Sequence, residues 1–368
     1  MSAIRLPHSL RRRFAAHLAR RSASAPDTWL DLAIFKIDRL GDFVLAVGAL
    51  RTLLRPFPPE RCVLIVSHIV APLAVAEFPG VRLVLLPAGA GAVVREWWPL
   101  RRAHRAFFDN TGFRRLVCLR HARSAYAAFV LSWAKHETWH GLAAAPSGKF
   151  EFGPEIAWPP NYPAEPRAPL CRELLAHQRV VAAALGREIA TAEILPRLTS
   201  VSATRGDYLL VAPCGTDAIR EYPAEALAGA LRAGADAVER IVFAGAPAQA
   251  DRLRALAAIA GVAHAEIRTG GDPVEFARLV AGARAVLAIE SAAAHLATAL
   301  DKPAVILLGG GHHGMFGPWG EGRRQRWLTE PLPCFGCGWQ CVFPEAYCLG
   351  QIAPERVAAA LREALAEG

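Results

Sequence analysis

Short apolar runs alternate with longer stretches rich in alanine and leucine along most of this chain. A short apolar run between turn residues predicts a buried strand, whereas apolar residues that repeat every three or four positions predict a helix. Strands are expected at residues 32–37, 63–67, 81–86, 116–119, 208–212, 240–244, 286–289 and 304–308. Alternation of this kind is typical of parallel, doubly wound sheets, so the pattern predicts an α/β protein.

The longer stretches predict the helices that connect these strands. They are expected at residues 43–54, 124–135, 170–185, 224–233, 249–259, 273–281, 290–300 and 355–366. A proline-rich passage at 150–169 and a turn-rich passage at 188–207 interrupt the alternation. Because 368 residues suit two α/β domains better than one, we predict domains at residues 29–188 and 189–352.

A basic leader, residues 1–28, comes before the first strand. Leu6, Leu10, Phe14 and Leu18 repeat every fourth residue, and arginines crowd the positions around them. Such a helix can lie on an anionic membrane surface, and a solvated arm is the alternative. We find no apolar run near the ~20 residues of a membrane span and no secretory signal peptide, so we expect a cytosolic protein.

The formal net charge of +9 predicts an anionic partner. Nucleic acid is not expected, because the chain has no zinc-finger spacing, RNA-recognition signature or helix-turn-helix. A membrane surface or a phosphorylated substrate fits the charge. Between residues 95 and 123, arginines and histidines are interleaved with aromatic residues. This segment predicts an anion-binding surface, with an ordinary solvated face as the alternative.

Residues 286–320 read as strand, helix, strand and glycine-rich loop, which together form a βαβ unit. Ser291 occupies an N-cap position at the carboxyl end of the first of these strands. The N–H groups of the following turn favour an anion, although an ordinary crossover without a ligand has the same pattern. The strand at 32–37 runs into a similar turn, which contains Gly41 and Asp42. We expect Asp42 to face the ligand-binding edge of its sheet.

The eight cysteines fall into two groups. Four are scattered through apolar or helical surroundings, where a buried small hydrophobic residue is expected. The other four, with the spacing C-x2-C-x3-C-x6-C, are Cys334, Cys337, Cys341 and Cys348. In a cytosolic chain this spacing suggests a structural zinc or iron site with thiolate ligands, and we assign it no catalytic role.

Three motifs occur in order along the chain. They are IFKIDRLGDFVLAVGALR at 34–51, APCGTDAIREYPAEAL at 212–227 and LAIESAAAHLATALDKPAVILLGG at 287–310, followed by GPWG at 317–320. Together they resemble glycosyltransferase family 9, the lipopolysaccharide heptosyltransferases. The resemblance implies a GT-B architecture, in which two doubly wound Rossmann-like domains face a central cleft. It also implies that the final helix, residues 353–368, packs back towards the first domain.

The resemblance further implies an inverting transfer of heptose from ADP-heptose to the inner core of lipopolysaccharide. The carboxylate of its Leu-Gly-Asp motif, here Asp42, is implied as the general base that takes the proton of the acceptor hydroxyl. No cofactor or catalytic metal is implied. The implied donor-binding residues are Gly215, Thr216, Arg220, Glu290, Ser291, Ala292, Ala293 and His295. The expected acceptor-binding residues are Arg101, Arg102, Arg120 and Arg123.

The chain also departs from the family's usual residues. Glu290 and Ala292 stand where the family usually has Asp and Gly, and the loop at 309–314 reads GGGHHG in place of Gly-Pro-Thr. The expected partners are a nucleotide sugar, an anionic glycolipid acceptor and the cytoplasmic face of the inner membrane. Two alternatives are a transferase with another nucleotide sugar or a protein acceptor, and a non-catalytic protein that binds nucleotide sugars or polyanions.

Overall fold

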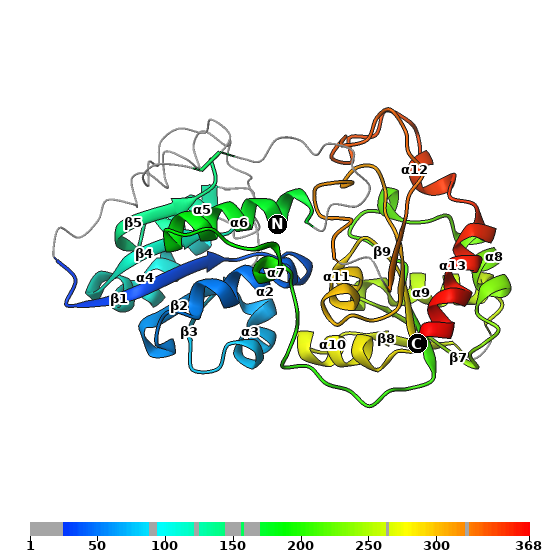
Figure 1. Cartoon of the computed structure of the whole chain (residues 1–368), viewed down its shortest axis with the longest axis horizontal. Helices are drawn as coiled ribbons and strands as arrows, with labels where there is room; N and C mark the ends of the chain where they lie inside the picture. Colours follow the sequence, from blue (N-terminus) through cyan, green and yellow to red (C-terminus); the bar gives the residue numbers. More distant parts are fainter. Residues whose placement is uncertain are drawn as a thin grey trace. The chain divides into compact units, whose positions relative to one another are not determined.

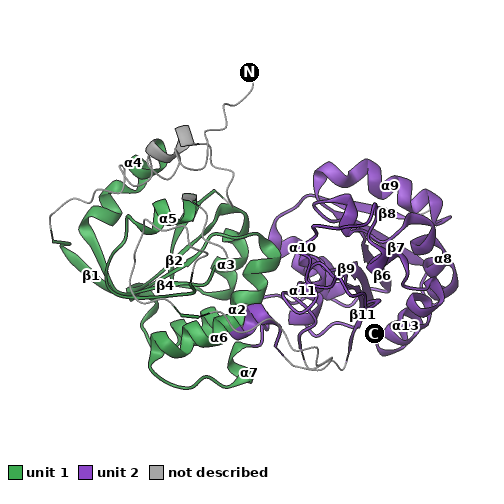
Figure 2. Ribbon diagram, turned by 90° about the horizontal axis from the view of Figure 1, so that it is seen from above, with its two compact units in different colours: residues 1–159, 176–194 green, residues 160–175, 195–368 purple. Residues whose placement is uncertain are grey.

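The structure is a computed structural model of the chain, and it describes residues 25–87, 94–120, 125–143, 156–157, 170–262, 265–320 and 324–368. The basic leader up to residue 24 lies outside the described residues. The chain divides into two compact units, coloured separately in Figure 2. Unit 1 is Met1–Pro159 with Ala176–Ile194, and unit 2 is Pro160–Leu175 with Leu195–Gly368. Each unit contains one parallel sheet.

Unit 1 is a five-stranded sheet in the order β3-β2-β1-β4-β5 (Figure 1). Its strands are β1 (Thr28–Lys36), β2 (Cys62–Ser67), β3 (Arg82–Leu86), β4 (Thr111–Cys118) and β5 (Lys135–Gly141). Its helices are α2 (Leu40–Leu54), α3 (Ala71–Glu77), α4 (Val94–Asn110), α5 (Ala125–Leu131), α7 (Thr191–Ile194) and most of α6 (Arg172–Leu185). The order reverses between β1 and β4, so the connections after these strands leave the sheet in opposite directions.

Unit 2 is a six-stranded sheet in the order β11-β10-β9-β6-β7-β8. Its strands are β6 (Tyr208–Ala212), β7 (Arg240–Gly245), β8 (Glu266–Thr269), β9 (Ala285–Ile289), β10 (Ala304–Leu307) and β11 (Gln325–Leu328). Its helices are α8 (Ala224–Gly234), α9 (Ala250–Ile259), α10 (Pro273–Gly282), α11 (Ala292–Ala299), α12 (Tyr347–Gly350) and α13 (Pro354–Glu367). Here the order reverses between β6 and β9.

The eight strands predicted from apolar runs are present, and three strands were missed. The missed strands β5, β8 and β11 have the sequences KHETWHG, EIRT and QRWL, and each lies at the edge of its sheet. An edge strand is covered less completely than a central one, so it can carry polar residues and shows no apolar run. The helix predicted at 124–135 is shorter, because β5 begins at Lys135.

Within unit 2, the C-terminal helix α13 packs against α8 and the core of this unit. It lies beside α8, at the red end of the chain in Figure 1, and contributes Val357, Leu361 and Leu365 to the core of this unit. A Cβ atom added to Gly234 of α8 would lie 2.8 Å from the Cα atom and carbonyl oxygen of Ala358. The two helix backbones therefore touch at this glycine.

The division into units also differs from the predicted domain boundary between residues 188 and 189. Helix α6 begins in unit 2, and unit 1 continues to Ile194. In unit 1, the Thr52 hydroxyl of α2 donates a hydrogen bond of 2.7 Å to the carbonyl oxygen of Glu193 in α7. This contact joins the end of unit 1 to its first helix. Within the described residues, no helix combines the length and the apolar character that crossing a bilayer requires.

Two glycine substitutions in α8 test how closely α13 packs on it. Gly234→Ala should lower the free energy of unfolding by roughly 1–3 kcal/mol, because the new methyl group meets backbone atoms that a side-chain movement cannot clear. Gly229→Ala is the matched control, since its nearest neighbour would be Pro354 Cβ at 3.7 Å, an ordinary contact. Relief of glycine's backbone entropy should stabilise this control by up to about 1 kcal/mol. Urea unfolding compares the two, and equal stability would contradict the close packing.

Candidate active site

Three connections of unit 2 meet at the carboxyl ends of its central strands. The connection after β6 includes Thr216 and a short helical turn, Ala218–Arg220. The connection after β9 contains Glu290 and Ser291 and leads into α11. The connection after β10 contains Gly309 to Gly311 and His312. Because the strands are parallel neighbours, these connections lie at the same edge of the sheet, where the strand order reverses.

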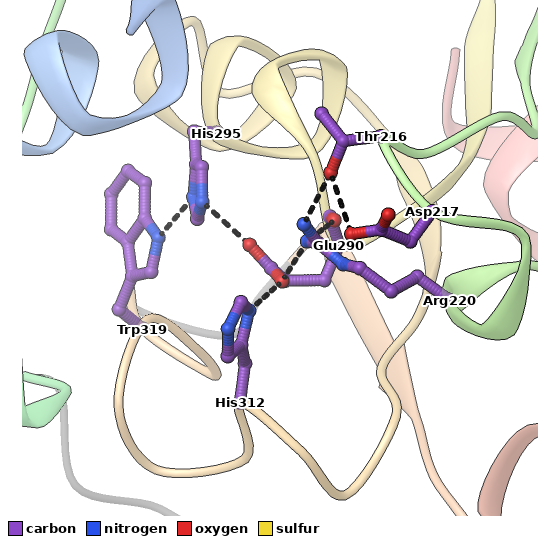
Figure 3. Close-up of polar contacts among 7 residues, drawn as sticks. All are labelled: Thr216, Asp217, Arg220, Glu290, His295, His312 and Trp319. Carbon is purple, nitrogen blue, oxygen red and sulfur yellow. Dashed lines mark hydrogen bonds and ion pairs between the residues drawn. The ribbon is translucent and has the colours of Figure 1, made fainter. Parts of the chain in front are cut away.

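The carboxylate of Glu290 is the centre of the polar contacts at this edge (Figure 3). Its side chain is 7% exposed. Arg220 Nη2 donates to Glu290 Oε2 at 2.8 Å and to the Glu290 carbonyl oxygen at 3.1 Å. His312 Nδ1 lies 2.8 Å from the same Oε2 atom, and His295 Nε2 lies 3.3 Å from Oε1. Both carboxylate oxygens therefore have partners, as a buried charge requires.

The hydrogen bonds around His295 determine its tautomer. The indole Nε1–H of Trp319 donates to His295 Nδ1 at 3.0 Å, and an indole nitrogen can only donate. Nδ1 must then carry a lone pair, which leaves the proton of the neutral ring on Nε2, facing Glu290. The row Trp319, His295, Glu290 holds the carboxylate in one orientation (Figure 3). His295 was predicted from the sequence, whereas Trp319 was only part of the GPWG motif and had no predicted role.

These contacts set the charge of Glu290. Burial alone raises the pKa of this carboxyl, but the hydrogen bonds from His295 and His312 outweigh burial and hold the pKa well below its ordinary value. The side chain is therefore ionised at neutral pH. Because an arginine is always a cation, Arg220 and Glu290 form a full ion pair. The two histidines contact the carboxylate of this pair.

Arg220 lies between polar and aromatic partners. Its guanidinium stands over the Trp339 ring, 5.5 Å from the ring centroid, and its Nη1 atom lies 3.4 Å from Thr216 Oγ1. The side chain is 17% exposed, and its Nε atom is buried without a hydrogen-bond partner. Gly215 was predicted to help bind the donor. In the structure its backbone N–H donates a hydrogen bond of 2.8 Å to Glu221 Oε1. Arg220, Thr216 and Asp217, whose Oδ2 atom lies 3.5 Å from Thr216 Oγ1, are the polar groups at the end of this loop (Figure 3).

Helix α11 begins directly after Glu290. Ser291 is its N-cap residue, in extended conformation, and the hydroxyl makes no capping hydrogen bond. Ala292 and Ala293 form the first turn, and Ala293 is buried. The small side chains leave the backbone of this turn close to the sheet edge. The first turn of α11 thus starts at Ala292, two residues after the buried carboxylate.

The predicted base Asp42 lies in unit 1, in the first turn of α2 at the carboxyl edge beside the point where the strand order reverses. Asp38, four residues earlier, is 4% exposed and pairs with Arg120 Nε at 2.6 Å and with Lys36 Nζ at 3.2 Å. Lys36 also donates to the Leu119 carbonyl oxygen at 3.0 Å. These buried contacts tie β1 to the end of β4 beneath the turn that leads to Asp42.

The predicted acceptor arginines that the structure describes differ in exposure. Arg120 is 9% exposed and pairs with Asp38, which makes it part of the interior of unit 1. On α4, Arg101 pairs with Asp109 and is only partly exposed, whereas the neighbouring Arg102 is exposed. Arg123 lies outside the described residues. Sequence reasoning read Arg120 as a free cation because the carboxylate that binds it comes from a distant part of the chain.

The four clustered cysteines do not form the predicted metal-ligand set. No group of three or more His, Cys, Asp or Glu side chains suited to a metal ion occurs among the residues that the structure describes. Cys348 is buried, and its Sγ atom accepts a hydrogen bond of 3.2 Å from the Gly310 N–H. Burial raises the pKa of this thiol, and the charges of the neighbouring Cys334, Cys337 and Cys341 raise it further.

Comparison with known proteins identifies relatives for this arrangement. Residues 166–342 match the family model of glycosyltransferase family 9 (heptosyltransferase). A stretch of 88 residues is 36% identical to lipopolysaccharide heptosyltransferase 1 of Pseudomonas aeruginosa. That stretch covers 24% of this chain and 24% of the relative, so the match spans about a quarter of the relative's length.

Solved structures resemble the chain over most of its length. The E. coli heptosyltransferase WaaC with ADP is 20% identical, with a TM-score of 0.67 over 91% of this chain and 99% of that one. The E. coli ADP-heptose lipopolysaccharide heptosyltransferase II is 18% identical, with a TM-score of 0.64 over 92% and 99%. The iron-containing glycosyltransferase TibC of enterotoxigenic E. coli, at 13% identity, has a TM-score of 0.52 over 93% and 78%. These likenesses in fold confirm the predicted GT-B architecture of two parallel-sheet domains.

Removing the charge of Glu290 should reveal its share of the stability. We expect Glu290→Gln to lower the free energy of unfolding by about 3 kcal/mol at pH 7, because it leaves Arg220 buried without its counter-charge. The lowered pKa means that Glu290 stabilises the fold above about pH 4.5, its ordinary value, and that this contribution is lost as the pH falls below it. The difference between wild type and variant should therefore shrink below that pH. Denaturant unfolding across pH measures it.

The control is the same change on an exposed carboxylate, Glu225→Gln in α8. It should change the free energy of unfolding by no more than about 0.5 kcal/mol. A Glu290→Gln protein as stable as this control would show that the carboxylate is not held as a buried ion pair.

Proposed function

Because residues 166–342 match the model of glycosyltransferase family 9, we propose that this chain is a member of that family and transfers a sugar from a nucleotide-sugar donor to an acceptor hydroxyl. ADP-heptose is the favoured donor, and the inner core of lipopolysaccharide is the favoured acceptor. The observation that carries the proposal is the pair of Glu290 and Arg220 at the carboxyl edge of the unit 2 sheet. It holds a permanent cation beside the first turn of α11, in the domain that the family model matches.

A diphosphate is the ligand that this edge suits best. The Arg220 guanidinium offers planar N–H donors, and the first turn of α11 offers backbone N–H groups with partial positive charge. Thr216 lies within 3.4 Å of Arg220 and adds a hydroxyl. Negative charge grows on the leaving nucleoside diphosphate as its bond to the sugar breaks. Groups that are already in position stabilise this charge in the transition state more strongly than they stabilise the ground state. They therefore accelerate the reaction.

We assign the general base to Asp42. A sugar hydroxyl is a weak nucleophile, and its oxygen attacks the anomeric carbon effectively only while its proton is being removed. A carboxylate within hydrogen-bond reach of the acceptor can take that proton. Attack on the face opposite the leaving diphosphate inverts the anomeric configuration. The proposed mechanism therefore needs one carboxylate in unit 1, one cationic site in unit 2 and no catalytic metal.

The donor sugar is where this chain departs from its family. The Glu290 side chain is one methylene longer than the family's usual Asp, and its carboxylate contacts three side chains. We expect this carboxylate to lie beside the donor sugar. A nucleotide sugar related to ADP-heptose is the second candidate for this reason. The acceptor we propose is an anionic glycolipid, which agrees with the net charge of +9. We accordingly propose peripheral binding at the cytoplasmic face of the inner membrane.

Asp42→Asn tests the base. The variant should lose about 10²- to 10⁴-fold in kcat, the range that general-base catalysis typically contributes. Its affinity for ADP should stay the same, because Asp42 belongs to the other unit. ADP release and the mass of the glycosylated acceptor measure turnover, and calorimetry measures ADP binding. Asp27→Asn, the same change at an exposed position of unit 1, is the control and should keep full activity. Full activity of Asp42→Asn would remove Asp42 as the base.

Arg220→Ala tests the diphosphate site. It should raise the KM for the donor and the Kd for ADP by about 10- to 100-fold, since a charge-assisted hydrogen bond contributes roughly 1.5–3 kcal/mol. The control is Arg254→Ala, which removes an exposed arginine of the same unit. Calorimetry with ADP, UDP and GDP also identifies the nucleobase of the donor nucleotide. Unchanged ADP affinity in Arg220→Ala would refute the assignment of Arg220 to the diphosphate.

A further inference from the structure

The segment 332–348, which carries the four clustered cysteines, has no part in the mechanism above. We call it the cysteine segment. It runs along the glycine loop, residues 309–311, and is joined to it by backbone hydrogen bonds. Gly336 N–H donates to the Gly310 carbonyl oxygen at 2.8 Å, and Gly338 N–H donates to the Gly311 carbonyl oxygen at 3.2 Å. The cysteine segment is therefore attached to the loop that leads to His312.

Two aromatic rings of the cysteine segment pack directly on the three glycines. A Cβ atom at Gly309 would lie 2.2 Å from the Trp339 ring, and one at Gly311 would lie 2.5 Å from it. A Cβ atom at Gly310 would lie 2.3 Å from the Phe335 ring. No other residue type fits these positions while the rings stay in place. The run of glycines thus serves to admit the two rings.

The backbone of Trp339 is in an unfavourable conformation. Its φ angle is +65°, in the left-handed region that bulky residues seldom adopt. Gly336 and Gly338, which also have positive φ angles, precede it in the same turn. A strained conformation persists only where the surrounding structure holds it, and such residues are common at functional sites. This strain suggests that the position of the Trp339 ring has a use.

The Trp339 ring contacts two of the three side chains that bind Glu290. The Arg220 guanidinium lies over it at 5.5 Å, a cation–π contact. The His312 ring meets it edge-on at 5.6 Å, with 79° between the planes. Arg220 Nε is buried and without a hydrogen-bond partner, so the ring face and the Glu290 carboxylate restrain this side chain. Without Trp339 the guanidinium would lose its ring-face contact and keep only the contacts of its Nη atoms with Glu290 and Thr216.

We propose that Trp339 is a positioning residue of the donor site. Its ring holds the Arg220 guanidinium in the orientation that binds the diphosphate of the nucleotide sugar, and the cysteine segment serves to place that ring. The identity of this ligand as a nucleoside diphosphate rests on the proposed function. The placement of Arg220 by Trp339 is independent of it.

ADP binding measured by calorimetry tests the proposal. Trp339→Ala should weaken ADP binding by about tenfold, because it removes the cation–π contact that orders Arg220. Trp339→Phe keeps a ring face and should bind ADP within about threefold of the wild type. Phe335→Ala is the matched control, since Phe335 packs on Gly310 in the same manner and contacts His313 instead of Arg220. It should lower thermal stability and leave ADP binding unchanged.

A double-mutant cycle separates positioning from general support of the fold. If Trp339 acts through Arg220, Trp339→Ala should weaken ADP binding no further in an Arg220→Ala background. An undiminished effect of Trp339→Ala in that background would overturn the proposal. So would equal losses of ADP affinity in Trp339→Ala and Phe335→Ala, because these would reflect loosening of the whole cysteine segment.

A measurement without ligand distinguishes a wrong donor assignment from a wrong placement of Arg220 by Trp339. The buried Arg220 Nε–H should exchange slowly with solvent, and its ¹⁵N NMR signal is identified by its loss in Arg220→Lys. Trp339→Ala should accelerate this exchange, whereas Phe335→Ala should not. If the wild type fails to bind ADP but the exchange behaves as expected, the proposed donor is wrong and the placement of Arg220 stands. If the wild type binds ADP and the exchange is the same in Trp339→Ala, the placement is wrong.

Discussion

The burial of one ionised carboxylate organises the candidate active site. Glu290 is 7% exposed, and moving such a charge out of water is costly unless every lone pair finds a partner. Its partners come from three separate connections: Arg220 after β6, His295 in α11 and His312 after β10. Satisfying the carboxylate therefore fixes these connections relative to one another.

The same requirement relates two departures from the family's usual sequence. Glu290 carries a longer side chain than the usual Asp, and His312 lies in the GGGHHG loop where Gly-Pro-Thr is usual. In the structure these two residues touch, with 2.8 Å between His312 Nδ1 and Glu290 Oε2. A longer carboxylate reaches the loop after β10, and a histidine there can hydrogen-bond to it. In this chain the two departures therefore meet in a single contact.

The sequence predicted those parts of the structure that depend on local pattern. The central strands have apolar runs because they are covered on both faces, and Ser291 is recognisable as an N-cap. Prediction from the sequence failed where the neighbours of a residue come from distant parts of the chain. Arg120 is buried by Asp38, 82 positions away, and Gly309 to Gly311 are small because Trp339 and Phe335 pack on them. Neither pairing leaves a spacing or a period that a single sequence can show.

Both units contain a buried carboxylate paired with an arginine, and the difference between the two pairs agrees with the separate roles that we propose for the units. Each has a buried carboxylate at the edge where its strand order reverses, paired with an arginine from a neighbouring connection: Asp38 with Arg120, and Glu290 with Arg220. In unit 1 a buried lysine completes the cluster and Arg120 is 9% exposed, so the cluster only supports the turn before Asp42. In unit 2 the arginine is 17% exposed and is held by the Trp339 ring and the Glu290 carboxylate. A cation held in this way stays oriented but keeps N–H groups to offer, which is what binding a leaving diphosphate demands.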